Sequence, residues 1–493
     1  MIWLILILLG LLLFAVVFIR FISSNHDTFE KMSIDSPPTS RLLGNFGQVI
    51  KQGIFQAQME WYSKYKDKKV YGVYDTLKPI MIIRDLDIVK DITVKSFNNF
   101  VNRRVIVEFD GPFMDNLLTI KDDHWKYVRN IMSPTFSSGR IKRMSQHLER
   151  NSQRLVNILR AKQERNENVE LKDIISHFTL DVIASTGFGL DINTIENPDN
   201  AFATNAKKCV RGSPLVVLLA FTAPWLLKLL GKIGVSMFSK ESLLFFTKTI
   251  DSAMESRKEE GEAGKVNDFM DLLINAEKES GQSDRGSLTR SEIHGQVILF
   301  ILAGYDTVST VLSFTLFMLA NHPECCQMLQ KEIDEKLGNE SPNYDNVQNL
   351  TKLDMCISET MRMYPPGFVL DRVCSDDITI QGIHIPKDMV VSFPVYAIHY
   401  DPEIWPEPEK FKPERFNIEN KASRHPYAYL PFGHGPRNCI GMRLALLELK
   451  IALAFVLKSL TPVTCDKTVY PAKLEKFQMK ALDGLWVKLN VRK

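Results

Sequence analysis

Cys439 stands in a run of residues that suits a cysteine thiolate bound to haem iron. The run, residues 431–441, has the spacing Phe-x-x-Gly-x-Arg-x-Cys-x-Gly. A cysteine thiolate as axial ligand pushes electron density onto the iron and favours cleavage of the O–O bond. Two neighbours are expected to help: Arg437 by pairing with a haem propionate, and Phe432 by covering the sulfur side of the ring.

The glycines of the run strengthen this interpretation. A lone cysteine is most often a small buried hydrophobe, so Cys439 by itself would predict nothing. Gly435 and Gly441 are expected where the backbone approaches another group and a β-carbon would clash. The fixed spacing of all these neighbours favours an iron ligand over a core cysteine.

A second chemical pair, Asp306 and Thr307, follows Ala303 and Gly304. A hydroxyl beside a carboxylate supplies a hydrogen-bond donor and a proton relay, which the reduction of oxygen requires. Gly304 is expected to leave space beside the pair, since it has no side chain. A threonine in a helix often bonds back to its own backbone, so the pair alone is weak evidence. Together with Cys439 it predicts proton delivery at a haem.

Glu359 and Arg362 lie three residues apart on a predicted helix that two prolines end. At that spacing the two side chains share one face. Arg415, in the run Phe-Lys-Pro-Glu-Arg-Phe, is expected to complete a Glu–Arg–Arg cluster. A Glu-x-x-Arg pair is usually a solvated helix face. Its place in the chain, between Asp306 and Cys439, instead predicts a structural role in which the cluster locks the segment that delivers the thiolate.

Several cations are candidates for binding the haem propionates. Trp125 and Arg129 lie four residues apart on a predicted helix and face the same way. An indole N–H and a guanidinium suit a pair of carboxylates on one edge of a porphyrin. Arg103 is a further candidate, although Arg104 adjoins it and either can turn inward. The remaining candidates are Arg372 and Arg437.

The pair Asp306 and Thr307 falls in the middle of a long predicted helix, about residues 290–320. Thr289 and Glu292 are placed to form a capping box at its start, and a helix of this length spans about 45 Å. The segment is apolar nearly all round, so a second transmembrane helix is the alternative. Because an aspartate at mid-bilayer costs about 2.5–3.5 kcal/mol, a helix through a protein core is favoured.

The remaining pattern predicts a mainly helical chain with small sheets near each end of the globular part. Residues 141–165, 246–280 and 324–337 are expected to be helices. Residues 70–85 alternate like a β-hairpin, and residues 378–386 are expected to form a short strand pair.

The N-terminus carries a membrane signal. Residues 2–19 contain no charge and are just long enough to span a bilayer, which predicts an uncleaved anchor over residues 1–22, with a cleaved signal peptide as the alternative. Arg20 follows the apolar run, so the rest of the chain is expected in the cytosol. Residues 23–40 are expected to form a linker, and residues 41–493 one catalytic domain. Residues 215–238 are either a core helix or a segment that dips into the membrane surface.

Composition narrows the function class. The chain has 493 residues and a net charge of only +3, which indicates no nucleic-acid partner. Its seven cysteines include no C-x-x-C pair. This argues against a disulfide framework or a zinc site and favours a reducing compartment.

These motifs, in this order, resemble the cytochrome P450 family of haem-thiolate monooxygenases. The resemblance is closest to the branch that holds the family 3 drug- and steroid-oxidising enzymes and the thromboxane synthases. It implies a triangular, mostly helical fold, haem b as cofactor and O2 as co-substrate. It also implies electrons from NADPH through NADPH–cytochrome P450 reductase, with cytochrome b5 as a second donor, and an endoplasmic-reticulum location with membrane lipid around the anchor. The runs that carry the resemblance are residues 102–104, 133–136, 300–307 and 436–443.

The resemblance also implies a pocket for small apolar substrates, with Ala303 beside the haem. Val308 departs from many relatives, which carry a threonine there, and the run Pro-Gly-Phe at 366–368 departs in the pocket region. The pocket residues implied are Asn116, Leu117, Phe300, Val369, Leu370, Phe477 and Gln478.

Two other functions remain open at this point. One is an isomerase or dehydratase on the same fold, which acts on lipid peroxides without O2 or a reductase. The other is a carrier of haem or lipid without catalysis. The pair Asp306 and Thr307 argues against the first, because that chemistry does not need an acid and an alcohol. The thiolate, the proton groups and the anchor together argue against the second.

Overall fold

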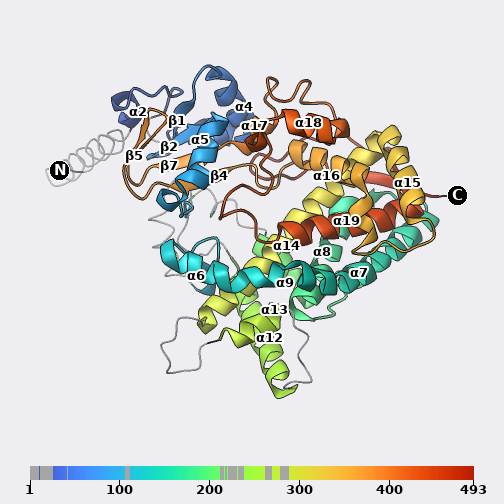
Figure 1. Ribbon diagram of the computed structural model, residues 1–493. Coiled ribbons are helices and arrows are strands. Elements are labelled where there is room, and N and C mark those ends of the chain that lie inside the picture. Colours follow the sequence, from blue (N-terminus) through green and yellow to red (C-terminus); the bar gives the residue numbers. More distant parts are fainter. Residues whose placement is uncertain are drawn as a thin grey trace, which may run out of the picture.

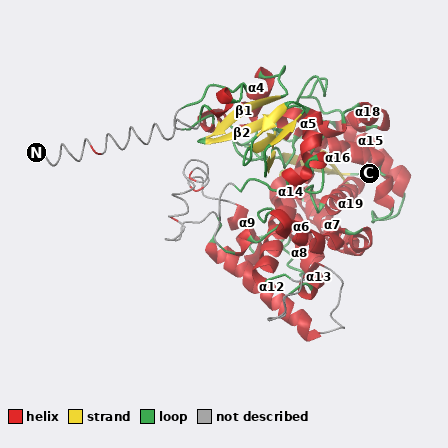
Figure 2. Cartoon of the chain, turned by 60° about the vertical axis from the view of Figure 1, so that its left-hand side comes forward, coloured by secondary structure: helices red, strands yellow, loops and turns green. Residues whose placement is uncertain are grey.

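The protein is described here from a computed structural model, in which residues 26–40, 43–105, 111–210, 238–260, 269–277 and 288–492 are described, with the single positions 10, 216, 219 and 230. Helices dominate this part of the chain and the strands form small sheets (Figure 2). The predicted fold class, mainly helical with small sheets, is confirmed. Apart from single positions, the predicted anchor at 1–22 and the stretch 215–238 lie outside the described residues.

The helix α14 (Arg290–Asn321) runs through the centre of the molecule (Figure 1). It begins at the predicted capping box: Thr289 Oγ1 accepts from the Glu292 N–H, and the Glu292 carboxylate accepts from the Thr289 N–H. Among the described helices, α14 alone is long and apolar enough to cross a membrane, yet 72% of its most apolar stretch is buried inside the protein. The structure therefore agrees with the prediction of a core helix.

The main apolar core is formed by four helices with the C-terminal half of α14: α8 (Leu171–Phe188), α16 (Thr351–Met363) and α19 (Met442–Ser459) pack on α14, and α7 (Ser138–Glu164) packs on α8 and α19. Buried side chains from every one of them contribute, and the cluster reaches from Phe55 to Leu489. The core therefore joins residues that lie far apart in the chain.

A second apolar cluster lies around the N-terminal half of α14. Helices α12 (Lys240–Glu260) and α13 (Phe269–Asn275) overlap the predicted helix 246–280, although α12 begins six residues earlier than predicted. Residues 261–268 and 278–280 lie outside the described part. The structure ends α13 at Asn275. The other helices of this cluster are α6 (Asp122–Met132) and α9 (Ala201–Val210).

The main sheet has four strands in the order β1-β2-β7-β4, in which β2 and β7 are parallel and the other pairs antiparallel. It lies at one side of the molecule, away from the helical core (Figure 1). The predicted hairpin at 70–85 and the strand pair at 378–386 are confirmed. The strands are β1 (Val70–Asp75), β2 (Lys78–Ile83), β3 (Val169–Glu170), β4 (Leu370–Val373), β5 (Ile378–Ile380), β6 (Ile383–Ile385), β7 (Val390–Phe393), β8 (Leu460–Val463) and β9 (Trp486–Val491).

Short helices connect these parts. The predicted helix at 324–337 is confirmed as α15, which begins at Pro323, a favoured first position. The remaining helices are α2 (Thr28–Lys31), α3 (Phe46–Gln52), α4 (Ile54–Lys64), α5 (Leu86–Lys90), α15 (Pro323–Leu337), α17 (Val395–His399) and α18 (Ile418–Ser423). Single turns are η1 (Asp91–Lys95), η2 (Phe97–Asn99), η3 (Pro112–Met114), η4 (Ser133–Phe136), η6 (Asn346–Asn349), η7 (Pro413–Phe416) and η8 (Pro426–Ala428).

Candidate active site

Cys439 lies in the loop that leads into α19. Its backbone N–H donates to the Phe432 carbonyl at 2.9 Å, which closes the loop into a compact turn. Burial raises the pKa of the Cys439 thiol, although the backbone N–H groups of Gly441 and Met442 act in the opposite direction. The residue is nevertheless exposed to solvent. A sulfur that many protein atoms surround, and that solvent still reaches, is placed to bind a ligand.

One glycine of this loop is required by close packing and the other is not. Gly435 has φ of +77°, and a β-carbon there would lie 1.9 Å from the Thr93 carbonyl oxygen. Gly441 was expected to avoid a clash as well, but a β-carbon there would meet only the Phe136 ring at 3.7 Å, an ordinary contact. That expectation is wrong as far as the protein's own atoms are concerned, because no backbone atom of another described segment lies within 4 Å of that position.

Buried and half-buried arginines surround this loop. Arg437 donates to the Val101 carbonyl at 2.8 Å and lies over the Trp125 ring, 4.6 Å from its centre. Arg129 donates to the Asn438 carbonyl and side-chain oxygens, both at 3.1 Å. The two α6 residues predicted to share a face, Trp125 and Arg129, therefore both contact residues of the Cys439 loop.

The structure distinguishes the neighbours Arg103 and Arg104. Arg104 forms ion pairs with Asp75 at 2.7 Å and Asp371 at 3.3 Å. Arg103 instead donates to the Arg437 carbonyl at 3.1 Å. Arg103 is therefore the one that turns toward the Cys439 loop, since Arg104 is held by carboxylates on the sheet.

Arg103, Arg372 and Arg437 form no ion pair with a carboxylate of the described residues, although each donates to at least one backbone carbonyl. The Nε atoms of Arg103, Arg372 and Arg437 are buried and find no hydrogen-bond partner among the described residues. Burial, followed by repulsion from Arg103, Arg372 and Arg129, lowers the pKa of Arg437, and burial and Arg103 lower that of Arg372. Unpaired buried charges are costly, so this cluster is built to receive an anionic group. The two propionates of haem b, with Cys439 close by, fit it.

The exposed face of α14 carries two predicted residues. Ala303 and Thr307, four residues apart, are exposed although most of their helix neighbours are buried. The Thr307 hydroxyl donates to the Ala303 carbonyl at 2.7 Å. Gly304 was expected to open space beside them, but a β-carbon there would lie 3.0 Å from Ile183 of α8. This expectation is corrected: the missing side chain lets α8 approach α14.

Asp306 forms an ion pair with a residue that no motif in the sequence marks. Lys172 of α8 donates to its carboxylate at 2.9 Å, although 134 residues separate the two in the chain. Asp306 and Thr307 thus differ in their surroundings: the carboxylate is paired, and the hydroxyl bonds only to its own helix.

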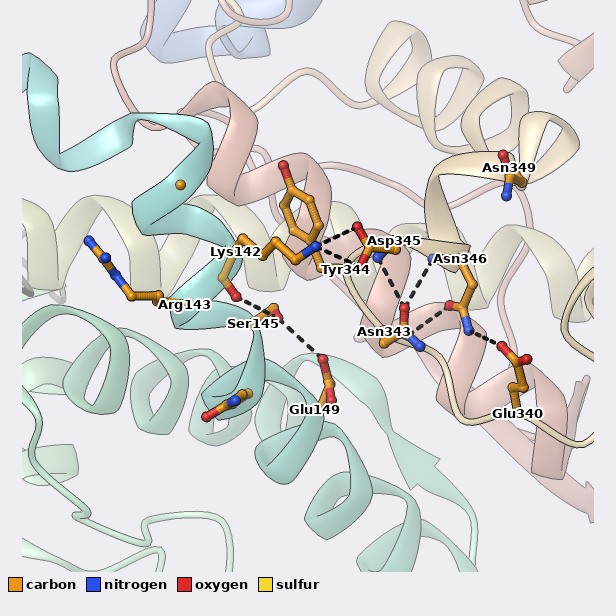
Figure 3. A pocket seen from close by; sticks show the side chains of 12 residues that line it. Lys142, Arg143, Ser145, Glu149, Glu340, Asn343, Tyr344, Asp345, Asn346 and Asn349 are labelled. Carbon is orange, nitrogen blue, oxygen red and sulfur yellow. Dashed lines mark hydrogen bonds and ion pairs between the residues drawn. The ribbon is translucent and has the colours of Figure 1, made fainter.

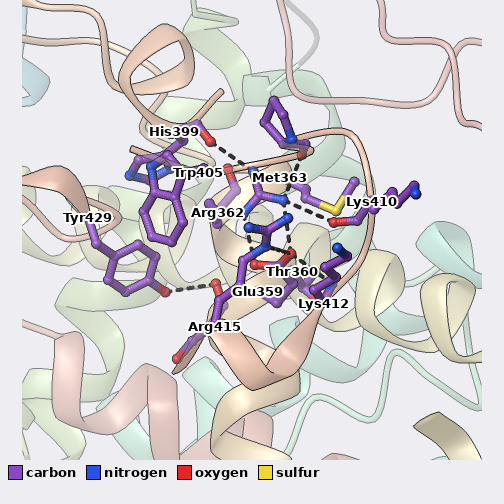
Figure 4. Close-up of polar contacts among 12 residues, drawn as sticks. Glu359, Thr360, Arg362, Met363, His399, Trp405, Lys410, Lys412, Arg415 and Tyr429 are labelled. Atoms are coloured by element: carbon purple, nitrogen blue, oxygen red, sulfur yellow. Dashed lines mark hydrogen bonds and ion pairs between the residues drawn. The ribbon is translucent and has the colours of Figure 1, made fainter. Parts of the chain in front are cut away.

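The Glu–Arg–Arg cluster forms as the sequence suggested (Figure 4). Glu359 accepts from Arg362 at 2.8 and 2.9 Å and from Arg415 at 3.2 Å. Glu359 and Arg362 are completely buried. Arg362 also donates to the carbonyls of His399 and Pro408, both at 2.8 Å. The cluster therefore ties α16 to the segment that precedes the Cys439 loop.

His399 completes this link and was missed by the sequence analysis. Its Nε2 accepts from the Leu430 N–H at 2.9 Å, and its Nδ1 lies 3.1 Å from the Arg362 carbonyl. Burial lowers the pKa of His399 to about 3, so the ring is neutral. A neutral ring that accepts at Nε2 donates from Nδ1. His399 thus joins Arg362 to Leu430, immediately before the loop of Cys439; nothing in its local sequence marked it.

The predicted pocket residues fall into two groups. Phe300 packs against Phe136 and Phe269, with ring centres 5.6 and 4.6 Å away. Asn116 is buried, and its side chain donates to the Phe113 carbonyl and accepts from the Leu118 N–H, which makes it a residue that shapes its loop.

The second group lies nearer to the loop of Cys439 or to solvent. Leu370 lies 3.4 Å from the position of a β-carbon on Gly433, directly against that loop, and Val369 precedes it. Leu117 is buried, and its N–H donates to Gln296 of α14. The other two, Phe477 and Gln478, are exposed.

Two hollows lie outside the candidate site. A surface groove of about 730 Å³ lies between α7 and residues 340–349, and there Lys142 pairs with Asp345 at 2.8 Å (Figure 3). A second, of about 360 Å³, is lined by Tyr364, Tyr396 and Tyr400 among others. Neither contains a predicted catalytic or cofactor residue, so neither is the active site.

Comparisons with known proteins agree with this geometry. The family model "Cytochrome P450" matches residues 35–486. The chain is 41% identical to cytochrome P450 3A7 of Homo sapiens over 456 residues, 91% of this chain and 89% of that protein. It is 40% identical to cytochrome P450 3A31 of Mesocricetus auratus over 462 residues (92% and 90%). It is 37% identical to cytochrome P450 3A56 of Fundulus heteroclitus over 454 residues (91% and 90%).

A family model that covers most of the chain and relatives of this similarity establish the family. The reaction follows from it: one atom of O2 enters an apolar organic substrate, xenobiotics and steroids among them, with haem as cofactor and NADPH supplying electrons through the reductase. The chain belongs to the cytochrome P450 family and is a haem-thiolate monooxygenase.

Proposed function

We propose that Cys439 is the axial ligand of the haem iron and that Arg103, Arg129, Arg372 and Arg437, with Trp125, hold the haem propionates. The observation that carries this is that the Nε atoms of three arginines near the loop of Cys439, Arg103, Arg372 and Arg437, are buried without a hydrogen-bond partner among the described residues. Haem, when bound, supplies the one-electron and O2 chemistry of the reaction. The N–H groups of Gly441 and Met442 lower the thiol pKa against the effect of burial, and so favour the thiolate that a metal ligand must be.

We further propose that Thr307 and Asp306 deliver protons. Thr307 is exposed on the face of α14 that also exposes Ala303. The Thr307 hydroxyl donates its hydrogen to the Ala303 carbonyl, so the lone pairs of its oxygen are free to accept. When the hydroxyl rotates, the same hydrogen becomes a donor to the site. Asp306 Oδ2 has no hydrogen-bond partner among the described residues, so it can accept a proton from solvent and pass it on. The pocket residues Val369 and Leu370 are proposed to line the substrate side.

Replacing Thr307 by alanine is expected to uncouple the reaction while haem and substrate binding remain. Loss of one acid–base contribution typically costs about 10²–10⁴-fold, and electrons would then leave as hydrogen peroxide or water. Asp306→Asn should act in the same direction. The measurement compares NADPH consumed, hydrogen peroxide formed and product formed in the haem-loaded enzyme with reductase.

Thr315→Ala is the matched control for this prediction. Thr315 lies on the same helix and donates to the Val311 carbonyl at 2.8 Å, as Thr307 does to Ala303, but it is buried in the core. Its loss should leave the ratio of product to NADPH unchanged. Full coupling in both Thr307→Ala and Asp306→Asn would remove the proton role from this pair.

We also propose that residues 1–22 anchor the protein in the endoplasmic reticulum membrane, with residues 23–40 as a linker and residues 41–493 as one domain in the cytosol. The uncharged run at 2–19 and Arg20 after it support this orientation. Membrane lipid and cytochrome b5 are the further partners of this arrangement, beside the reductase.

Removing residues 2–22 is expected to leave haem binding intact and to weaken membrane attachment. The physical reason is that the main apolar core of the described residues begins at Phe55, well after this run. Cells that express the shortened protein are separated into membrane and soluble fractions, which measures attachment. The spectrum of the reduced CO complex in each fraction measures haem binding. Loss of the haem spectrum, or unchanged attachment in high salt and carbonate, would contradict the role of the anchor.

A further inference from the structure

A buried lysine stands behind the proposed proton residues. Lys172 Nζ lies within hydrogen-bond distance of four oxygen atoms of α14: the carbonyl and Oδ1 of Asp306, both at 2.9 Å, and the hydroxyls of Ser309 and Thr310, both at 2.7 Å. Only 19% of the Lys172 side chain is exposed, against 48% for Asp306. The lysine is therefore inside, and the carboxylate reaches outward from it.

The directions of these hydrogen bonds can be assigned. The Ser309 hydroxyl also lies 2.7 Å from the Tyr305 carbonyl, and the Thr310 hydroxyl 2.8 Å from the Asp306 carbonyl. A carbonyl only accepts, so each hydroxyl gives its single hydrogen to the helix and presents lone pairs to Lys172. An ammonium has three N–H donors and no acceptor. Lys172 therefore has every donor engaged by oxygen atoms of α14.

These contacts also shape the helix beside Thr307. The carbonyls of Ala303, Tyr305 and Asp306 each accept a side-chain hydroxyl in addition to their places in the helix. Such bonds by serine and threonine bend helices slightly. Lys172, which belongs to α8, donates to the Asp306 carbonyl in the same turn. The turn that carries Asp306 and Thr307 is thus held by polar contacts, with Lys172 as their centre.

We propose that Lys172 is the positioning residue for proton delivery by Asp306. It holds Oδ1 and the adjacent carbonyl, so that Oδ2 is the oxygen left to exchange protons toward Thr307. This proposal rests on the proton role proposed above for Asp306 and Thr307. Without the ammonium, the carboxylate could rotate freely into solvent, and the Ser309 and Thr310 oxygens would lose their donor.

The test uses the full-length, haem-loaded enzyme with reductase and compares Lys172→Met, Asp306→Asn and the double variant. Loss of a hydrogen bond to a charged group gives effects of about 10- to 100-fold, and we expect the ratio of product to hydrogen peroxide in Lys172→Met to fall within this range. Because Lys172 acts through Asp306, the double variant should be no worse than Asp306→Asn. Lys172→Arg, which keeps the charge, should restore part of the ratio.

A second readout does not depend on activity. Amide hydrogen exchange over residues 303–310 should be faster in haem-loaded Lys172→Met than in the wild type. Lys207→Met is the matched control: Lys207 bonds to His177 and Asp173 of α8 and not to α14. It should change neither the exchange nor the product ratio.

The outcomes separate this proposal from the one it rests on. A normal ratio in Asp306→Asn contradicts the proton role itself. A reduced ratio in Asp306→Asn with a normal ratio in Lys172→Met, or effects that multiply in the double variant, overturns only the role of Lys172. Should Lys172→Met fail to hold haem, Lys172→Gln, which keeps two donors, takes its place. Loss of haem in both would also overturn the proposal, because Lys172 would then be a folding residue.

Discussion

Replacing Cys439 by histidine is expected to shift the absorption of the reduced CO complex from the position typical of a thiolate-ligated haem to that of an imidazole-ligated haem. Product formation should fall to background, because an imidazole lacks the electron push that favours O–O cleavage. The arginine cluster does not include Cys439, so the variant should still hold haem. Absorption spectra of the reduced CO complex and product assays with reductase measure the two effects.

Cys465→Ser is the control for this experiment. All seven cysteines are free, and Cys465 is only partly buried, but it lies near Thr468 rather than beside the buried arginines. Its variant should show the spectrum and activity of the wild type. A thiolate-type spectrum that persists in Cys439→His would contradict the assignment, since among the seven Cys439 is the one whose thiol pKa both Arg103 and Arg129 lower.

The parts of the fold that sequence could predict are those that local rules decide. The start of α14 follows from two residues, Thr289 and Glu292, whose side chains cap the first turn. A place for α14 inside the protein rather than in a bilayer is favoured by Asp306, because a carboxylate at mid-bilayer is costly. The spacing of Glu359 and Arg362 likewise places both on one helix face, and the structure confirms Arg415 as the predicted third member of the cluster.

The parts that could not be predicted depend on contacts between distant segments. Lys172 lies at the start of α8, where a lysine is usually exposed to solvent. Only the packing of α8 on α14 brings it to Asp306. The same packing explains the error at Gly304: the helix face that lacks a side chain is turned to Ile183, not to Thr307. Arg103 and Arg104 are equivalent in sequence, and the carboxylates of Asp75 and Asp371 distinguish them only in three dimensions.

Replacing Glu359 by alanine is expected to yield little haem-loaded protein. The carboxylate is completely buried and accepts from Arg362, from Arg415 and from the Lys412 N–H at 2.9 Å. Removing one partner of a buried ion pair costs about 3–5 kcal/mol, because the remaining charge is left without a partner. That is a large part of the stability of an ordinary domain, about 5–15 kcal/mol.

The damage should reach the loop of Cys439 through a short path. Arg362 holds the His399 carbonyl, and His399 holds Leu430, which directly precedes the loop. Once Arg362 is free to move, the loop loses its fixed position, and haem should be lost before the helices unfold. The amount of haem per protein and the midpoint of thermal unfolding, measured on the same preparation, follow the two steps.

Glu414→Ala and Glu359→Gln are the controls for the Glu359→Ala variant. Glu414 is exposed and adjoins Arg415, so its variant removes a carboxylate from the same region without exposing a buried charge and should retain haem. Glu359→Gln keeps the shape and one acceptor oxygen, and its effect should fall between wild type and alanine because the two arginines remain unneutralised. A purely structural role predicts that Glu359→Ala loses haem and that the enzyme that keeps haem forms the usual product. A stable, haem-loaded Glu359→Ala enzyme that forms a different product would instead assign Glu359 to the reaction.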